Sequence, residues 1–138
     1  KSTMKLITNM ILLLSALFIA TAQAEDEEAT APNEEVIYVE LKPAFVTNYQ
    51  SHKMGYLKAD VTLQVKGGLT ADAISRHKPA IRHHLVMLFS SQSEEALSTM
   101  EGKQMLKEAA LNELINALQE EGEAADVQDV LFTSFIVD

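Results

Sequence analysis

The sequence predicts one α+β domain with the element order β-β-β-α-α-β, in which the helices pack on one face of a small sheet. Residues Tyr56–Val65 alternate apolar and polar side chains with the period of a half-buried strand. Between residues 70 and 122 the apolar side chains follow a helical period instead, and Val127–Val137 returns to a strand composition. Strands and helices that segregate along the chain in this way are typical of the α+β class.

The first 24 residues have the layout of a Sec-type export signal. A basic start at Met4–Lys5 precedes the apolar run Ile7–Ala20, and Ala22 and Ala24 supply the small residues of a cleavage site. The apolar run is shorter than the roughly 20 residues that span a bilayer. We therefore expect residues 1–24 to be a signal peptide or, if uncleaved, an N-terminal membrane anchor. Either way, the rest of the chain is expected in the periplasm.

An acidic, flexible linker is expected at residues 25–35, ahead of a folded domain at residues 36–138. The linker holds six acidic residues and no large apolar side chain, so it has nothing to bury in a core. The remainder has the length of one compact domain. The chain contains no cysteine, so a hydrophobic core has to hold the domain without disulfides.

The charge of the chain excludes two classes of partner. All 20 acidic residues follow Ala24, and the formal net charge of the whole chain is −9 at pH 7. A surface of this sign repels nucleic acid and anionic lipid headgroups. We therefore expect no nucleic-acid partner, and membrane contact only through the N-terminal segment if it stays uncleaved.

Three strands are predicted ahead of the helices. Val36–Leu41 is rich in β-branched and aromatic residues, and Phe45–Tyr49 follows as a short second strand. Lys42–Pro43 separates the two, because proline has no N–H to donate to a strand ladder. Tyr56–Val65 is the third strand, with one face toward the core and the other toward water, and Gly67 and Gly68 end it.

The first helix is expected to be divided by Pro79. Thr70 or Asp72 is the expected N-cap. The apolar stripe of this helical segment runs through Ile74, Ile81, Leu85 and Leu88. A proline inside a helix costs about 3 kcal/mol, so we expect a kink or a break near Lys78.

A second helix follows the polar break Ser90–Ser93. Ser98 and Glu101 fit a capping box at its start. Glu120–Gly122 is expected to close the helix. Its predicted buried face consists of Leu106, Ala110, Leu114, Ala117 and Leu118, joined by Leu111 and Ile115.

The last strand, Val127–Val137, carries apolar side chains on both faces and is expected beside the long third strand. Simple alternation assigns Val130, Phe132 and Ile136 to one face and Leu131, Phe135 and Val137 to the other. A strand with two apolar faces is usually central in its sheet or contacts another subunit. A self-association or partner surface is therefore predicted at Leu131, Phe132, Phe135 and Val137, with core burial as the alternative for these side chains.

The histidines are the candidates for an active or metal site. His77 and His84 are seven residues apart and His83 is adjacent, but no Asp or Glu between Ala73 and Ser93 completes a site of three or four ligands. We expect a solvated or partly packed face there, no catalytic residue, no metal and no cofactor. A pH response of the adjacent pair is a further hypothesis. The sequence thus predicts a protein that acts by contact and is not an enzyme.

With these segments in place, the chain resembles the FliL family of flagellar basal body-associated proteins. The resemblance covers roughly Val36 to Asp138. It is carried by Tyr38–Asn48, Tyr56–Lys58, Pro79–Leu85, Leu88–Gln92, Leu97–Lys103 and Val130–Val137, in that order and at matching spacing. The short apolar run with its cleavage site departs from the clear membrane span that is usual in the family, and allows a soluble FliL-like paralogue.

The resemblance implies a fold similar to the stomatin-type domain and assembly into rings. It also implies a periplasmic, inner-membrane-tethered protein without enzymatic activity. Such a protein associates with the stator units of the flagellar motor and with the basal body, and supports torque, swimming or swarming. The alternative expectation is a periplasmic small-ligand or protein-binding module unrelated to the motor. That module requires a concave apolar pocket with a few converging polar groups.

Overall fold

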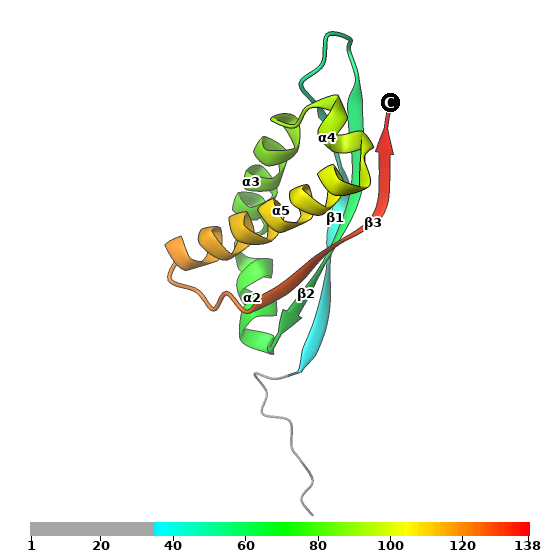
Figure 1. The fold of residues 1–138 in the computed structure, drawn as a ribbon. Coiled ribbons are helices and arrows are strands. Elements are labelled where there is room, and N and C mark those ends of the chain that lie inside the picture. The colour runs from blue at the N-terminus through cyan, green and yellow to red at the C-terminus, as the bar shows by residue number, and fades with distance from the viewer. Residues whose placement is uncertain (1–34) are drawn as a thin grey trace, which may run out of the picture.

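A three-stranded antiparallel sheet forms the centre of the fold, in a computed structural model that describes residues 35–138. The predicted leader at residues 1–24 and nearly all of the acidic linker lie outside the described residues. The strands are β1 (Val36–Asn48), β2 (Tyr56–Lys66) and β3 (Val127–Val137), in the order β1-β2-β3. β2 is therefore central, and β1 and β3 are the two edges (Figure 1).

Within the described residues, four helices lie between β2 and β3 along the chain and pack against one face of the sheet (Figure 1). They are α2 (Gly68–Arg76), α3 (Lys78–Ser90), α4 (Glu94–Ser98) and α5 (Met100–Glu120). The predicted α+β class is confirmed. The expected element order is wrong, because two strands precede the helices and four helices replace the expected two.

The two strands expected on either side of Lys42–Pro43 are one continuous strand, β1. Leu41 is paired with Val61 and Phe45 with Ala59. More residues of β1 than of β2 lie between these two pairs, so β1 bulges away from regular pairing there. A proline is tolerated because β1 is an edge strand and this irregularity needs no ladder hydrogen bond from it. Arg82 also covers the irregularity, since its Nη1 donates to the Leu41 carbonyl oxygen at 3.4 Å.

β2 confirms the alternation read from the sequence. The five apolar side chains of its inner face are all buried under the helices, whereas the polar side chains between them are exposed or half-buried. This face forms the floor of the core. The residues concerned are Leu57, Ala59, Val61, Leu63 and Val65.

Pro79 divides the first helical segment as predicted. α2 ends at Arg76 and α3 begins at Lys78, which places the proline in the first turn of α3, where its missing N–H is harmless. The expected N-cap of the segment is wrong: Gly67 is the capping position and contributes no side-chain hydrogen bond. Thr70 is buried instead, and its hydroxyl accepts from the backbone N–H of Asp126, just before β3, at 3.1 Å.

The start of α5 lies one residue beyond the predicted capping box. Thr99 is the N-cap, and its hydroxyl accepts from the Gly102 N–H at 3.0 Å. Ser98 closes the short, unpredicted helix α4, where it donates to the Glu94 carbonyl oxygen at 2.7 Å. The end of α5 at Glu120 and its five buried side chains agree with the prediction.

β3 has the predicted bounds and pairs with β2 as expected, but it is an edge strand and not a central one. Its register shifts between Ser134 opposite Asp60 and Phe132 opposite Val61, which inserts Thr133 as an extra residue. This bulge reverses the alternation. Phe132 and Phe135 therefore share the core-facing side, contrary to the faces that simple alternation assigned.

Candidate interaction surface

The structure places three of the four predicted interface residues on the core-facing side of β3. Phe132, Phe135 and Val137 are opposite inner-face residues of β2 and are only partly buried. Phe132 lies between two aromatic rings, with its centroid 6.0 Å from that of Phe89 and 5.2 Å from that of Phe135. These side chains extend the core to the edge of the sheet, where part of each remains accessible.

Leu131, the fourth predicted residue, lies on the opposite face of the sheet. It is paired with Thr62 and is half-buried. Ile136 shares this face, because it is paired with Lys58, and it is 51% exposed. β3 thus presents apolar atoms on both faces at one edge of the sheet, although the four residues do not form one continuous cluster.

A groove of about 310 Å³ separates the N-terminal half of α5 from β3. Lys107, one of its lining residues, forms an ion pair with Asp129 of β3, with its Nζ 3.1 Å from Asp129 Oδ1. The same carboxylate oxygen accepts from the backbone N–H of Val130 at 2.9 Å. The groove is lined by Met100, Lys103, Gln104, Lys107, Val130, Leu131 and Phe132. The lining of the groove is therefore partly apolar and partly cationic. The groove lies beside the edge strand β3.

The sheet face turned away from the helices carries exposed apolar side chains that sequence reasoning treated only as the wet side. Tyr38 and Val46 on β1 are 60% and 63% exposed. They are paired with Gln64 and Lys58, so on this face apolar edges flank a polar centre. The sequence of β1 contained part of this signal, since three of its outward positions, Val36, Tyr38 and Val46, are β-branched or aromatic.

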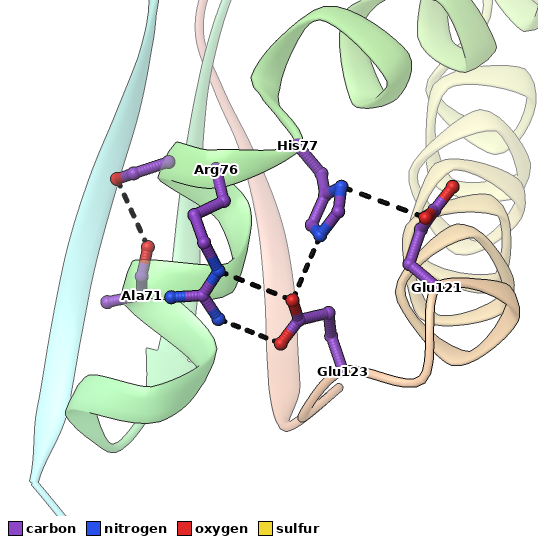
Figure 2. A network of polar contacts seen from close by, with 6 residues as sticks. Ala71, Arg76, His77, Glu121 and Glu123 are labelled. Atoms are coloured by element: carbon purple, nitrogen blue, oxygen red, sulfur yellow. Dashed lines mark hydrogen bonds and ion pairs between the residues drawn. The ribbon is translucent and has the colours of Figure 1, made fainter.

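A polar network joins the end of α2 to the segment between α5 and β3 (Figure 2). Arg76 Nη2 lies 2.8 Å from Glu123 Oε2, and Arg76 Nε donates to Glu123 Oε1 at 3.3 Å. His77 Nε2 lies 3.0 Å from the same Oε1, and its Nδ1 lies 4.0 Å from Glu121 Oε2. The hydrogen bond from Arg76, followed by that from His77, lowers the pKa of Glu123.

The histidines are placed differently from one another. His77 contacts acidic residues that follow α5, far from it in the sequence. His84 Nδ1 lies 3.4 Å from Glu113 Oε2 on α5, and His83 is exposed. Among residues 35–138, no three potential ligands cluster as a metal site would require.

A second, larger hollow lies between the β1–β2 turn and α4. It has a volume of about 910 Å³. The turn is attached to the helical layer by the Gln50 N–H, which donates to the Gln92 carbonyl oxygen at 2.8 Å. Every lining residue is polar: Gln50, Ser51, His52, Lys53, Ser93, Glu94, Glu95 and Ser98.

None of the described helices combines the length and apolar character needed to cross a membrane. This observation concerns residues 35–138 alone.

Comparison with known proteins gives a consistent result. The family described as "Flagellar basal body-associated protein FliL" matches residues 38–137. The "Flagellar protein FliL" of Aquifex aeolicus is 29% identical over 108 residues, which cover 78% of this chain and 65% of that protein. Those of Escherichia coli and Shigella flexneri are each 36% identical over 77 residues, covering 56% of this chain and 50% of theirs. The aligned part thus spans half to two thirds of these relatives. Because the family match extends from β1 to the end of β3, the chain belongs to the FliL family of flagellar basal body-associated proteins.

Proposed function

We propose that this protein associates with the stator units of the flagellar motor in the periplasm and supports torque, swimming or swarming. The observation that carries the proposal is the family match over residues 38–137, which covers every described helix and strand except the first two residues of β1. Its action is a contact: it favours the working state of the stator by binding that state more tightly than the resting one. Only such a difference in affinity shifts the equilibrium between two states.

The contact uses copies of the domain assembled into a ring, in the manner of stomatin-type domains. A ring requires one patch of each copy to meet a different patch of the next. β3 supports this proposal, because an edge strand offers both unpaired backbone groups and partly exposed apolar side chains. Leu131, Phe132, Phe135 and Val137 are its proposed contact residues.

Residues 1–24 are proposed to export the domain, either as a cleaved signal peptide or as a retained anchor in the inner membrane. Residues 25–35 set the distance between the anchor and the domain in the second case. The larger of the two described hollows does not favour the alternative of a small-ligand module. The larger hollow has an entirely polar lining, whereas small-molecule pockets are mostly apolar and concave.

A deletion strain tests the proposed function. Removing the gene is expected to reduce the diameter of swimming or swarming colonies, and expression of the wild-type protein from a plasmid is expected to restore it. Flagellar number, counted by electron microscopy, serves as the control for a defect in assembly. Unchanged colony diameters on both soft and swarming agar would contradict a role in motility.

A further inference from the structure

The sheet has two free edges that run in the same direction. Within residues 35–138, β1 and β3 each pair with β2 on one side only, and both are antiparallel to it. Both also start at the same end of β2 (Figure 1). There the Glu35 carbonyl oxygen accepts from the Gly67 N–H at 2.7 Å, and the Asp126 carbonyl oxygen accepts from the Lys66 N–H at 2.9 Å. The β3 edge of one copy is therefore able to lie beside the β1 edge of another copy in the same orientation.

We propose that the β3 edge of one copy contacts the β1 edge of the next copy in the ring, with the two neighbouring strands parallel. This inference rests on the proposed function, which places a contact between copies at β3, and it adds the second patch of that contact. A cyclic ring needs two different patches, because every copy offers one to the copy ahead and the other to the copy behind. The second patch is centred on Glu40 and Val46 of β1.

The strand register decides which residues of the two edges meet. A closed ring has no rise from one copy to the next, so with the strands along the ring axis each level of the sheet stays at one level around the ring. Ile136 and Val46 are both paired with Lys58, so they lie at one level and on one face of the sheet. In the ring, Ile136 of one copy therefore meets Val46 of the next. This orientation also keeps the start of β1 at the same end of every copy, as attachment of all copies to one membrane requires.

The side chains at this level are suited to such a contact. Val46 is 63% exposed and Ile136 is 51% exposed, although both are large and apolar. They lie on the face of the sheet that the helices leave open, on either side of the charged Lys58. Among the described elements none covers them, so another chain is what removes their apolar surface from water.

The irregular parts of the two edges also lie at the same level. β1 departs from regular pairing between the residues opposite Val61 and Ala59, and β3 departs from it between the residues opposite Val61 and Asp60. In the proposed contact, the two irregular segments therefore interrupt the same point, and regular strand lies beside regular strand on either side of it. The matched stretches are Tyr38–Leu41 with Asp129–Phe132, and Phe45–Thr47 with Phe135–Val137.

The groove beside β3 supplies a match of charge. Lys103 and Lys107 line it together with Leu131. Leu131 and Glu40 are paired with the same residue of β2, so the ring brings Glu40 of the next copy to the level of the groove. Within residues 35–138, Lys103 has no ion-pair partner, and the Glu40 carboxylate contacts only the exposed Lys42, at 2.8 Å. Opposite charges on the two patches favour this pairing over the meeting of two β3 edges, which would bring the lysines of both copies together.

Single cysteines test the contact in the full-length chain, which has no cysteine of its own. Val46→Cys and Ile136→Cys chains with different tags are produced together in the deletion strain and treated with a mild oxidant. A disulfide is expected between the two variants in the mixture and not in cells that produce either variant alone, because the contact joins different patches. Non-reducing electrophoresis and immunoblotting against both tags identify the product.

Tyr38→Cys in place of Val46→Cys gives the matched control. Tyr38 is also exposed on the open face of β1, but its partner Gln64 lies about 20 Å along β2 from Lys58, the partner of Val46. A disulfide requires Cα atoms within about 7 Å of each other. The Val46 pair is therefore expected to cross-link at least about tenfold faster than the Tyr38 pair, since the contact raises the effective concentration of its two thiols.

Charge reversal tests the match between the groove and β1. Adding Glu40→Lys to the Val46→Cys chain, or Lys103→Glu to the Ile136→Cys chain, is expected to slow cross-linking severalfold, and the two changes together should restore it. Thermal unfolding followed by circular dichroism verifies that each purified variant is folded.

Three results would overturn the proposal: equal rates for the Val46 and Tyr38 pairs, the absence of any cross-link, or a disulfide in cells that produce Ile136→Cys alone. In the last case two β3 edges would meet each other. The motility of the deletion strain is a separate readout. Reduced motility without the cross-link refutes this contact and leaves the stator role standing, whereas the cross-link together with normal motility does the reverse.

Discussion

Glu123 connects the end of α2 to the segment that leads into β3. It accepts from Arg76 through both carboxylate oxygens and contacts His77 through one of them. Its pKa is lowered mainly by the hydrogen bond from Arg76. A carboxylate whose pKa is lowered by folding stabilises the folded state when it is ionised.

We expect Glu123→Gln to unfold at a lower urea concentration than the wild type at neutral pH. The stabilisation by Glu123 is fully present above the ordinary carboxyl pKa and is lost as the pH falls through the lowered pKa of the folded state. The difference between the two proteins should therefore shrink in acid. Glu120→Gln, an exposed change at the end of α5, is the control. A difference that stays constant from neutral pH to acid would refute this role.

Arg82 supports the irregular part of β1 from α3. Its guanidinium lies 4.1 Å from the centre of the Phe45 ring, and its Nη1 donates to the Leu41 carbonyl oxygen. We expect Arg82→Ala to lower the free energy of unfolding by about 1–2 kcal/mol, because a cation–π contact and a hydrogen bond to a carbonyl are lost together. Urea unfolding measures this loss. Arg82→Lys should be intermediate, and a wild-type result for both variants would contradict the assignment.

At the level of residues, the sequence predicted burial better than partners. The inner face of β2 and the buried face of α5 follow directly from periodicity. The partners of His77 did not, because Glu121 and Glu123 are more than 40 residues away in the chain and are brought close only by the packing of α5. The same reason hid the contact between Thr70 and Asp126.

At the junction of α4 and α5 there is no room for one additional carbon atom on Gly102. A Cβ placed on Gly102 would collide with the backbone carbonyl group of Ala96. We expect Gly102→Ala to lower the free energy of unfolding by about 1–3 kcal/mol, because the overlap outweighs the better helix propensity of alanine. Gly68→Ala, at a helical position with no neighbouring atom within 4 Å, is the matched control and should be neutral or stabilising.

β3 is the element that the proposed ring depends on, and Leu131 is its half-buried residue on the face away from the helices. If Leu131 meets a neighbouring copy, Leu131→Asp places a charge in an apolar contact and should shift the protein toward monomers. Size-exclusion chromatography with light scattering measures the molar mass over a range of concentrations. Thr133→Asp adds the same charge at an exposed position of the same strand and should leave the mass unchanged. Identical behaviour of the two variants would argue against this contact.

Element boundaries were predictable where a strong signal marks them, as Pro79 does between α2 and α3. The faces of β3 were not, because the extra residue Thr133 reverses the alternation, and no turn or glycine in the sequence announces it. β1 was read as two strands for a related reason. A proline ends a central strand but is accommodated at an edge, and edge position is a property of the whole sheet.

At the scale of the whole molecule, the domain is a sheet with one face under helices and one face without them (Figure 1). Both edges of the sheet carry partly exposed apolar side chains, and a cationic groove borders one edge. Under the proposed function, these are the surfaces available for contact with other chains. The α+β class followed from the segregation of strand and helix patterns, whereas the surfaces emerged only once the strand order and registers were known.

The torque of single motors under load tests the central claim most directly. Beads attached to flagellar stubs report rotation speed in the deletion strain and in the same strain carrying the wild-type gene. A protein that favours the working state of the stator should raise torque at high load, so the deletion is expected to lower the high-load speed, with recovery on complementation. Superimposable torque–speed curves for the two strains would contradict the account.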